Sequence, residues 1–153
     1  MKIIHTDARN QDFVGLCRLL DGHLDELVGG AIKREKFNQF NLLKDIDFVV
    51  LIYLDNVAVA GGGLKHYQDA TAEIKRIFVR KDYRGRGLSK TLMKELEMQA
   101  LEKGYRKLVL ETGELLVESM NLYRSVGFTI IDNYPPYDRM EESVCMEKLL
   151  LKK

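Results

Sequence analysis

The sequence predicts a single mixed α/β domain, in which one sheet is built from strands that alternate with helices. A length of 153 residues and a hydrophobic content of 46% fit one continuous core. Along the chain, apolar residues recur at helical spacing in some segments and in short β-branched runs in others, which is typical of a layered fold. No linker rich in proline, glycine or serine divides the chain. We therefore treat residues 1–153 as one domain.

The first part of the chain predicts a strand followed by two helices. The strand lies around Lys2 to Thr6. After it, apolar residues from Phe13 to Leu27 recur at helical spacing, and the pair Gly29-Gly30 predicts the end of this helix. A second helix is expected over Ile32 to Leu43.

A β-hairpin follows these helices. Phe48 to Leu54 is rich in β-branched and aromatic residues, and Asp55-Asn56 can take the positive φ angles of a two-residue turn into Val57 to Leu64. The second strand of the hairpin carries Gly61-Gly62-Gly63, which predicts a bulge or the close approach of another group.

The second half of the chain alternates strands with helices, and a loop that contains two glycines joins its first strand to its first helix. This strand–helix–strand order predicts a right-handed crossover between parallel strands. The expected elements are a strand over Glu73 to Val79, the loop Arg80 to Arg86, a helix from Leu88 to Ala100 that Gly104 ends, a strand over Lys107 to Glu111, a helix from Leu115 to Val126 that Gly127 ends, a strand from Phe128 to about Asp132, and a last strand over Val144 to Leu150.

Composition excludes several classes of function. Lys plus Arg number 24 and Asp plus Glu number 23, and this balance disfavours a nucleic-acid partner. The longest wholly apolar run, Phe48 to Leu54, is far shorter than the roughly 20 residues that span a bilayer, and polar residues interrupt the N-terminus, so we expect a cytoplasmic protein without membrane insertion. Cys17 and Cys145 have no CxxC partner, so we expect two buried thiols and no metal site.

The loop Arg84-Gly85-Arg86-Gly87-Leu88-Ser89 leads from a predicted strand into a predicted helix. Unpaired N–H groups at a helix N-terminus favour an anion, and glycines let a phosphate approach the backbone. Arg80, Lys81 and Lys90 add positive charge nearby, so the loop predicts a site for a phosphorylated ligand. A tight strand-to-helix turn with solvated arginines is the alternative interpretation.

Two common phosphate-binding patterns do not fit this loop. A P-loop requires glycine at two positions that Arg84 and Ser89 occupy here. A Rossmann fingerprint requires glycine or alanine at the position that Lys90 occupies. The remaining pattern, Arg-x-x-Gly-x-Gly/Ala, resembles that of the GNAT superfamily, the Gcn5-related N-acetyltransferases that use acetyl-coenzyme A. The chain departs from that pattern at Ser89, and since serine is small we expect the pyrophosphate site to be preserved.

The resemblance to the GNAT superfamily covers about half of the chain. Ala72 to Val79 is similar to the fourth strand of the family, Leu108 to Thr112 to its fifth strand, and Asn121 to Phe128 to its C-terminal helix and the strand that follows. It implies the acyl-CoA N-acyltransferase fold, a mixed and mostly antiparallel central sheet with flanking helices. The sequence looks most like a small, single-domain bacterial branch of the family.

The resemblance also implies where acetyl-CoA binds as the cosubstrate. Pantetheine is expected along Ile77, Phe78 and Val79, with the Val79 amide donating to the thioester oxygen and Asn121 holding the pantetheine or phosphate region. An amide aimed at developing negative charge is typically worth roughly 3 kcal/mol of barrier. The pyrophosphate is expected on the backbone N–H groups of Arg84, Gly85, Arg86, Gly87, Leu88 and Ser89.

Tyr123 matches the position of the acid in the family. A phenol is protonated at neutral pH and can donate its proton to the departing thiolate of coenzyme A. The alternative is a side chain that only fills the buried stripe of its helix.

Glu73, at the start of a strand, is the expected base, because some GNAT branches carry a glutamate there. Glu111, His66 and His5 are alternatives, and Glu111 can equally be a structural partner of an arginine. The segment Tyr134 to Arg139 resembles the loop that walls the acceptor pocket in GNAT proteins, and it is equally explained as a rigid surface turn.

The resulting prediction is an acetyl-CoA-dependent N-acetyltransferase that acts on a primary amine of a small molecule by direct attack. A module that binds or senses acyl-CoA without turnover is the alternative, and the two failed fingerprints count against a nucleotide-binding domain. The resemblance leaves the acceptor, the exact base, a different acyl group and a homodimer open.

Overall fold

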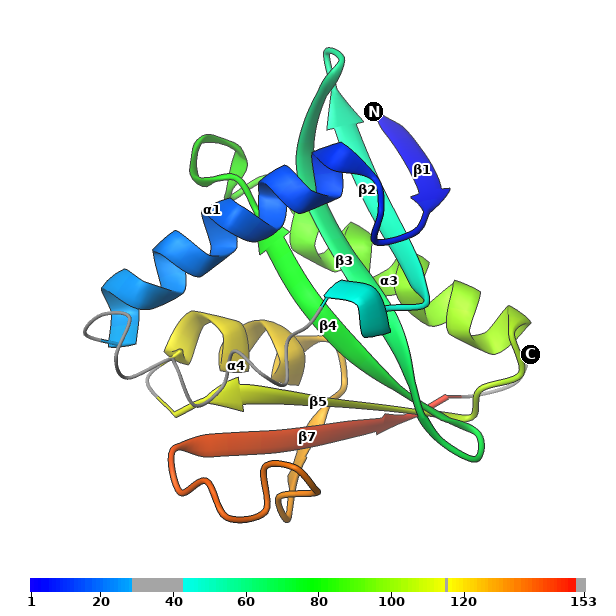
Figure 1. Ribbon diagram of the computed structural model, residues 1–153, viewed down its shortest axis with the longest axis vertical. Coiled ribbons are helices and arrows are strands. Elements are labelled where there is room, and N and C mark those ends of the chain that lie inside the picture. Colours follow the sequence, from blue (N-terminus) through cyan, green and yellow to red (C-terminus); the bar gives the residue numbers. More distant parts are fainter. Residues whose placement is uncertain (29–42, 115, 151–153) are drawn as a thin grey trace.

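The protein forms one seven-stranded sheet with helices on both of its faces (Figure 1). The computed structural model describes residues 1–28, 43–114 and 116–150. The strand order is β1-β2-β3-β4-β5-β7-β6, and every neighbouring pair is antiparallel except β4 and β5. The elements are β1 (Lys2–Thr6), α1 (Gln11–Val28), β2 (Phe48–Leu54), β3 (Val57–Gln68), β4 (Thr71–Val79), α3 (Leu88–Glu102), β5 (Lys107–Gly113), α4 (Val117–Ser125), β6 (Thr129–Ile131) and β7 (Ser143–Leu149), with short 3₁₀ helices at Leu43–Asp45 and Lys81–Tyr83.

The predicted mixed, mostly antiparallel sheet is confirmed, and the order of the described elements is the predicted one. β3 and β5 run further than predicted, to Gln68 and Gly113. The helix predicted over Ile32 to Leu43 and the predicted helical residue Leu115 lie outside the described residues, apart from Leu43 itself, which begins a 3₁₀ helix.

The hairpin turn and the three glycines behave as the sequence predicts, with one difference in the position of the bulge. Asp55 and Asn56 have φ angles of 48° and 66°, as a two-residue turn between β2 and β3 requires. A Cβ atom on Gly62 would lie 2.3 Å from Cδ1 of Ile77, so the close approach is real. The extra residue of the bulge, however, lies in β4, where Arg76 has a φ of 61°.

Two hydrophobic clusters pack on opposite faces of the sheet. α1 covers one face, where Phe13 and Leu16 pack with Phe78 of β4. α3 and α4 cover the other face, where Leu92 and Tyr123 pack with alternate residues of the strands. In Figure 1, α1 passes in front of β3 and β4 while α3 lies behind them.

β4 and β5 separate after a short stretch of parallel pairing. The ladder joins Thr71 to Lys107, Ala72 to Leu108 and Glu73 to Val109, and it ends there although both strands continue. The backbone edges beyond Glu73 and Val109 therefore face each other without a shared ladder. This divergence positions the site described below.

Two further expectations from the sequence concern the cysteines and the membrane. Cys17 and Cys145 are free thiols and are 3% and 0% exposed, which confirms that both are buried. Among the described residues, no helix has the length and apolar character that crossing a bilayer requires.

Candidate active site

The loop before α3 has the backbone geometry that its glycines predict. Gly85 and Gly87 adopt φ angles of 80° and 78°, in the left-handed region that glycine occupies without strain. Apart from each glycine and its two chain neighbours, no described atom lies within 4 Å of the position that a Cβ atom would occupy on either residue. The space beside this backbone is therefore open to a ligand.

The N-terminus of α3 presents N–H groups at the end of this loop. Gly87 caps the helix, no side chain caps it within the described chain, and the first turn contains no acidic residue. The first amide that closes a helical turn is that of Thr91, which donates to the Gly87 carbonyl at 3.1 Å. Among the described residues, the amides from Gly85 to Lys90 are free to bind an anion, which the helix dipole also favours. The Arg84 amide, which the sequence also predicted as a donor, instead donates to the Lys81 carbonyl at 3.3 Å, because the chain makes a 3₁₀ turn there.

The arginines of the loop hold its shape. The Arg84 Nε donates to the Val79 carbonyl at 3.0 Å, and its guanidinium lies 5.4 Å from the centre of the Phe78 ring. Arg86 lies over the Tyr83 ring at 5.0 Å. Both side chains remain exposed, so they add positive charge at the loop while they brace it.

The predicted pantetheine strand, Ile77 to Val79, lies on the part of β4 beyond the end of the β4–β5 ladder. The Arg80 amide donates to the Val59 carbonyl of β3, and since successive amides alternate along a strand, the Val79 amide is directed away from β3. Arg76 and Ile77 together face Gly62 at the bulge, so pairing with β3 is interrupted there. The unpaired edge of β4 therefore carries backbone donors.

Tyr123 lies on α4, within the cluster that packs on the α3 face of the sheet. Its side chain is 8% exposed, its ring packs edge-on against Phe128, and no hydrogen bond joins its hydroxyl to another described residue. Burial raises the pKa of Tyr123, and the charge of Glu111 raises it further. The phenol therefore keeps its proton through the neutral and mildly alkaline range. Asn121, two residues earlier on the same helix, is exposed.

Glu73 lies on the α1 face of the sheet and is 4% exposed. Its Oε2 accepts a hydrogen bond of 2.6 Å from the Tyr134 hydroxyl, and its Oε1 lies 3.6 Å from Nζ of Lys75. Tyr137 also hydrogen-bonds Glu73. Both carboxylate oxygens are thus already occupied by groups of the protein.

The sequence interpretation missed Lys75, which lies beside Glu73 and also feels the charge of a second carboxylate, that of Glu111. Lys75 is 6% exposed and donates to the Tyr137 hydroxyl at 3.0 Å. Burial lowers its pKa, while the charges of Glu73 and Glu111 act in the opposite direction. Glu111 accepts a 2.8 Å hydrogen bond from Ser143. A lysine two positions from Glu73 on the same face of a buried strand was the available signal.

The predicted site residues therefore fall into two groups. The glycine loop and Tyr123 belong to the α3 side of the sheet, whereas Glu73 belongs to the α1 side. The histidines that were alternatives as the base have other partners: His5 pairs with Glu95 at 2.7 Å, and Nδ1 of His66 lies 3.0 Å from the Tyr105 hydroxyl.

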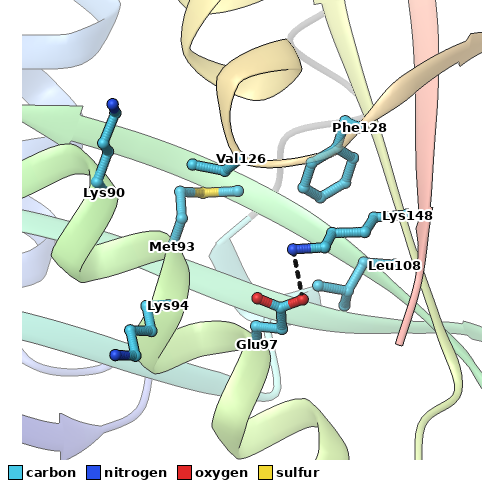
Figure 2. Close-up of a pocket in the computed structure, with 8 residues that line it drawn as sticks. All are labelled: Lys90, Met93, Lys94, Glu97, Leu108, Val126, Phe128 and Lys148. Atoms are coloured by element: carbon cyan, nitrogen blue, oxygen red, sulfur yellow. Dashed lines mark ion pairs between the residues drawn. The ribbon is translucent and has the colours of Figure 1, made fainter. Parts of the chain in front are cut away.

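A groove that the sequence did not predict runs between α3 and the end of α4, with a volume of about 270 Å³. It begins in the first turn of α3, and the 2.7 Å ion pair between Lys148 and Glu97 lies across it (Figure 2). Lys94 also lines it, so lysines flank an apolar floor. The lining residues are Lys90, Met93, Lys94, Glu97, Leu108, Val126, Phe128 and Lys148.

Comparison with known proteins agrees with this geometry. The model of the acetyltransferase (GNAT) family matches residues 8–128. The IAA acetyltransferase of Azospirillum brasilense is 32% identical over 137 residues, which cover 90% of both chains. An uncharacterized N-acetyltransferase of Dictyostelium discoideum is 36% identical over 80 residues, 52% of this chain, and the match spans 37% of that relative.

The fold also resembles that of a solved structure. The crystal structure of a candidate acyl-CoA N-acyltransferase from Klebsiella pneumoniae superposes with a TM-score of 0.80, covering 98% of this chain and 97% of that one at 24% identity. The chain belongs to the acetyltransferase (GNAT) family. The predicted enzyme class is thereby confirmed: an N-acetyltransferase that takes its acyl group from an acyl-CoA donor.

Proposed function

We propose that this protein transfers the acetyl group of acetyl-CoA to a primary amine of a small molecule by direct attack. One observation carries the proposal. The free amides of the α3 loop and the Tyr123 phenol lie on one side of the sheet. The Glu73 cluster, which consists of Glu73, Lys75, Tyr134 and Tyr137, lies on the other side, and the β4–β5 ladder ends between the two groups. This arrangement supports an acyl donor and an amine that approach each other from opposite faces.

In this proposal the backbone of the loop and of β4 binds the donor. The pyrophosphate lies on the amides from Gly85 to Ser89, pantetheine runs along Ile77 to Val79, and Asn121 holds the pantetheine or phosphate region. The thioester oxygen accepts a hydrogen bond from an amide on the unpaired edge of β4, where Ile77 and Val79 both lie. A preorganised donor of this kind lowers the barrier because it meets charge that develops only in the transition state.

Two ionisable groups then move protons. The amine nitrogen forms a bond to the thioester carbon, the carbon–sulfur bond breaks, and Tyr123 gives its proton to the departing thiolate. Glu73 receives the proton that the amine loses. The raised pKa of Tyr123 means that the phenol still carries a proton to give at the pH where the reaction runs.

The test is a screen of primary amines for release of free coenzyme A. We expect acetyl-CoA to bind in a calorimetric titration, and thiol to appear only when a suitable amine is present. An acyl-CoA-binding module without turnover predicts the same binding and no amine-dependent thiol. Failure of acetyl-CoA itself to bind would contradict both proposals.

A further inference from the structure

Glu73 cannot receive a proton directly from an amine at the thioester. A strand rises about 3.3 Å per residue, so the α-carbons of Glu73 and Ile77, four residues apart with a bulge between them, are separated by roughly 10–13 Å. Val79 is further still. Glu73 is 4% exposed, and both of its carboxylate oxygens face groups of the protein. The described groups that contact the carboxylate are therefore placed to pass it a proton.

Within the described parts of the chain, three groups contact the Glu73 carboxylate, and they differ in access. Lys75 is 6% exposed and Tyr137 is 1% exposed, and the two are joined by a 3.0 Å hydrogen bond. Tyr134 is only partly buried, and its hydroxyl donates to Glu73 over 2.6 Å. Of the three, Tyr134 is the one that reaches the surface of the cluster.

From this arrangement we infer that Tyr134 relays the proton from the acceptor amine to Glu73, an inference that rests on the proposed function. The Tyr134 oxygen accepts a proton from the ammonium form of the acceptor, which dominates at neutral pH, while its own O–H proton passes to Oε2 of Glu73, so that the neutral amine can attack. One N–H bond breaks, the phenol is regenerated, and the carboxylate becomes a carboxylic acid. No other reactant is needed.

The ring of Tyr134 is held in place independently of its hydroxyl. It packs edge-on against Tyr67, with ring centres 5.0 Å apart, and against Tyr137 at 5.5 Å. Burial and the negative charge of Glu73 raise the pKa of Tyr134, so the relay passes through the neutral phenol and not through a phenolate. The groups that face it are Glu73 from β4, Tyr67 from β3, Tyr137 from the β6–β7 loop and Cys145 from β7, with Lys75 and Glu111 behind Glu73.

The variant Tyr134→Phe removes the hydroxyl and keeps both ring contacts. We expect its kcat/KM for the best amine of a panel containing tyramine, putrescine and glycinamide to fall about 100-fold near neutral pH, with acetyl-CoA affinity unchanged. The defect should shrink as pH approaches 10, where an alkylamine has already lost its proton. Tyr53→Phe is the matched control, because its hydroxyl also donates to a carboxylate, that of Asp12, which lies outside the group of residues around Glu73, and it should keep near-normal activity.

The double variant of Tyr134→Phe with Glu73→Gln tests whether the two residues act as one unit. The relay predicts that it is no slower than the slower single variant, because groups that act in series are not additive. The relay is overturned, and the proposed function is not, if Tyr134→Phe lowers kcat/KM by the same factor at every pH or leaves it at the parental value. A parental enzyme that releases no coenzyme A with any amine of the panel overturns the proposed function and the relay with it.

Discussion

Replacement of Tyr123 by phenylalanine separates the role of its hydroxyl from the role of its ring. The ring packs edge-on against Phe128 at 6.0 Å and remains in the variant. The hydroxyl has no hydrogen-bond partner among the described residues, so its removal leaves no group newly unpaired. We therefore expect the free energy of unfolding to change by less than about 0.5 kcal/mol.

The expected effect of Tyr123→Phe on the rate is much larger than its effect on stability. General acid catalysis typically contributes 10²–10⁴-fold, which corresponds to roughly 3–5 kcal/mol of barrier. The acid role predicts a loss of this order in kcat, with acetyl-CoA affinity nearly unchanged. Because the pKa of Tyr123 is raised, the parental enzyme should show no loss from its deprotonation below pH 10.

The assay is a single-turnover measurement of thiol release with an amine that the screen has verified. Single turnover avoids masking of the chemical step by slow product release. Tyr105→Phe is the control, since its hydroxyl lies 3.0 Å from His66 and away from the glycine loop. If the Tyr123 variant transfers acetyl groups at the parental single-turnover rate, the residue is a core side chain and the thiolate takes its proton from water.

Two further predictions concern the loop and alkaline stability. Gly87→Val places a β-branched residue at a φ of 78°, and we expect a loss of acetyl-CoA affinity of at least tenfold in calorimetry with the fold retained. Arg86→Ala should reduce acetyl-CoA affinity less, because the guanidinium charge only supplements the backbone amides. Equal acetyl-CoA affinity of the Gly87 variant and the parent would refute the assignment of this loop as the pyrophosphate site. Above pH 10 the free energy of unfolding should fall by about 1.4 kcal/mol per pH unit for each buried tyrosine whose pKa is raised, because the unfolded chain loses that proton first. Tyr137 is 1% exposed, and Tyr137→Phe should make the fall in the free energy of unfolding with pH, measured by urea titrations, less steep by the contribution of one tyrosine. An unchanged pH dependence would show that Tyr137 does not contribute.

The sequence predicted the strands and helices well where local patterns decide them. The run of β-branched and aromatic residues from Phe48 to Leu54 and the turn at Asp55-Asn56 depend on nearby residues only, and the structure agrees with both. The bulge in β4 could not be placed, because it depends on how Arg76 and Ile77 meet the glycines of the neighbouring strand. The three glycines of β3 indicated the right location for the bulge, but the extra residue lies in β4 and not in β3.

The candidate site divides in the same way. The glycine loop is a local motif, and its positive φ angles at Gly85 and Gly87 follow from the residue type. The Glu73 cluster joins residues from β4 to the loop before β7, and no local pattern shows that Tyr134 lies 2.6 Å from Glu73. The groove beside α3 likewise depends on how α4 and β7 are placed against that helix.

The two cysteines provide the last argument for direct attack. An acyl-enzyme route needs a side-chain nucleophile, and a thiol is effective only as the thiolate. Burial raises the pKa of Cys17, and it raises that of Cys145 to about 11. At neutral pH both thiols are protonated, and both are enclosed, with exposed fractions of 3% and 0%. Neither cysteine is therefore suited to carry the acetyl group, which supports the proposed direct attack by the acceptor amine.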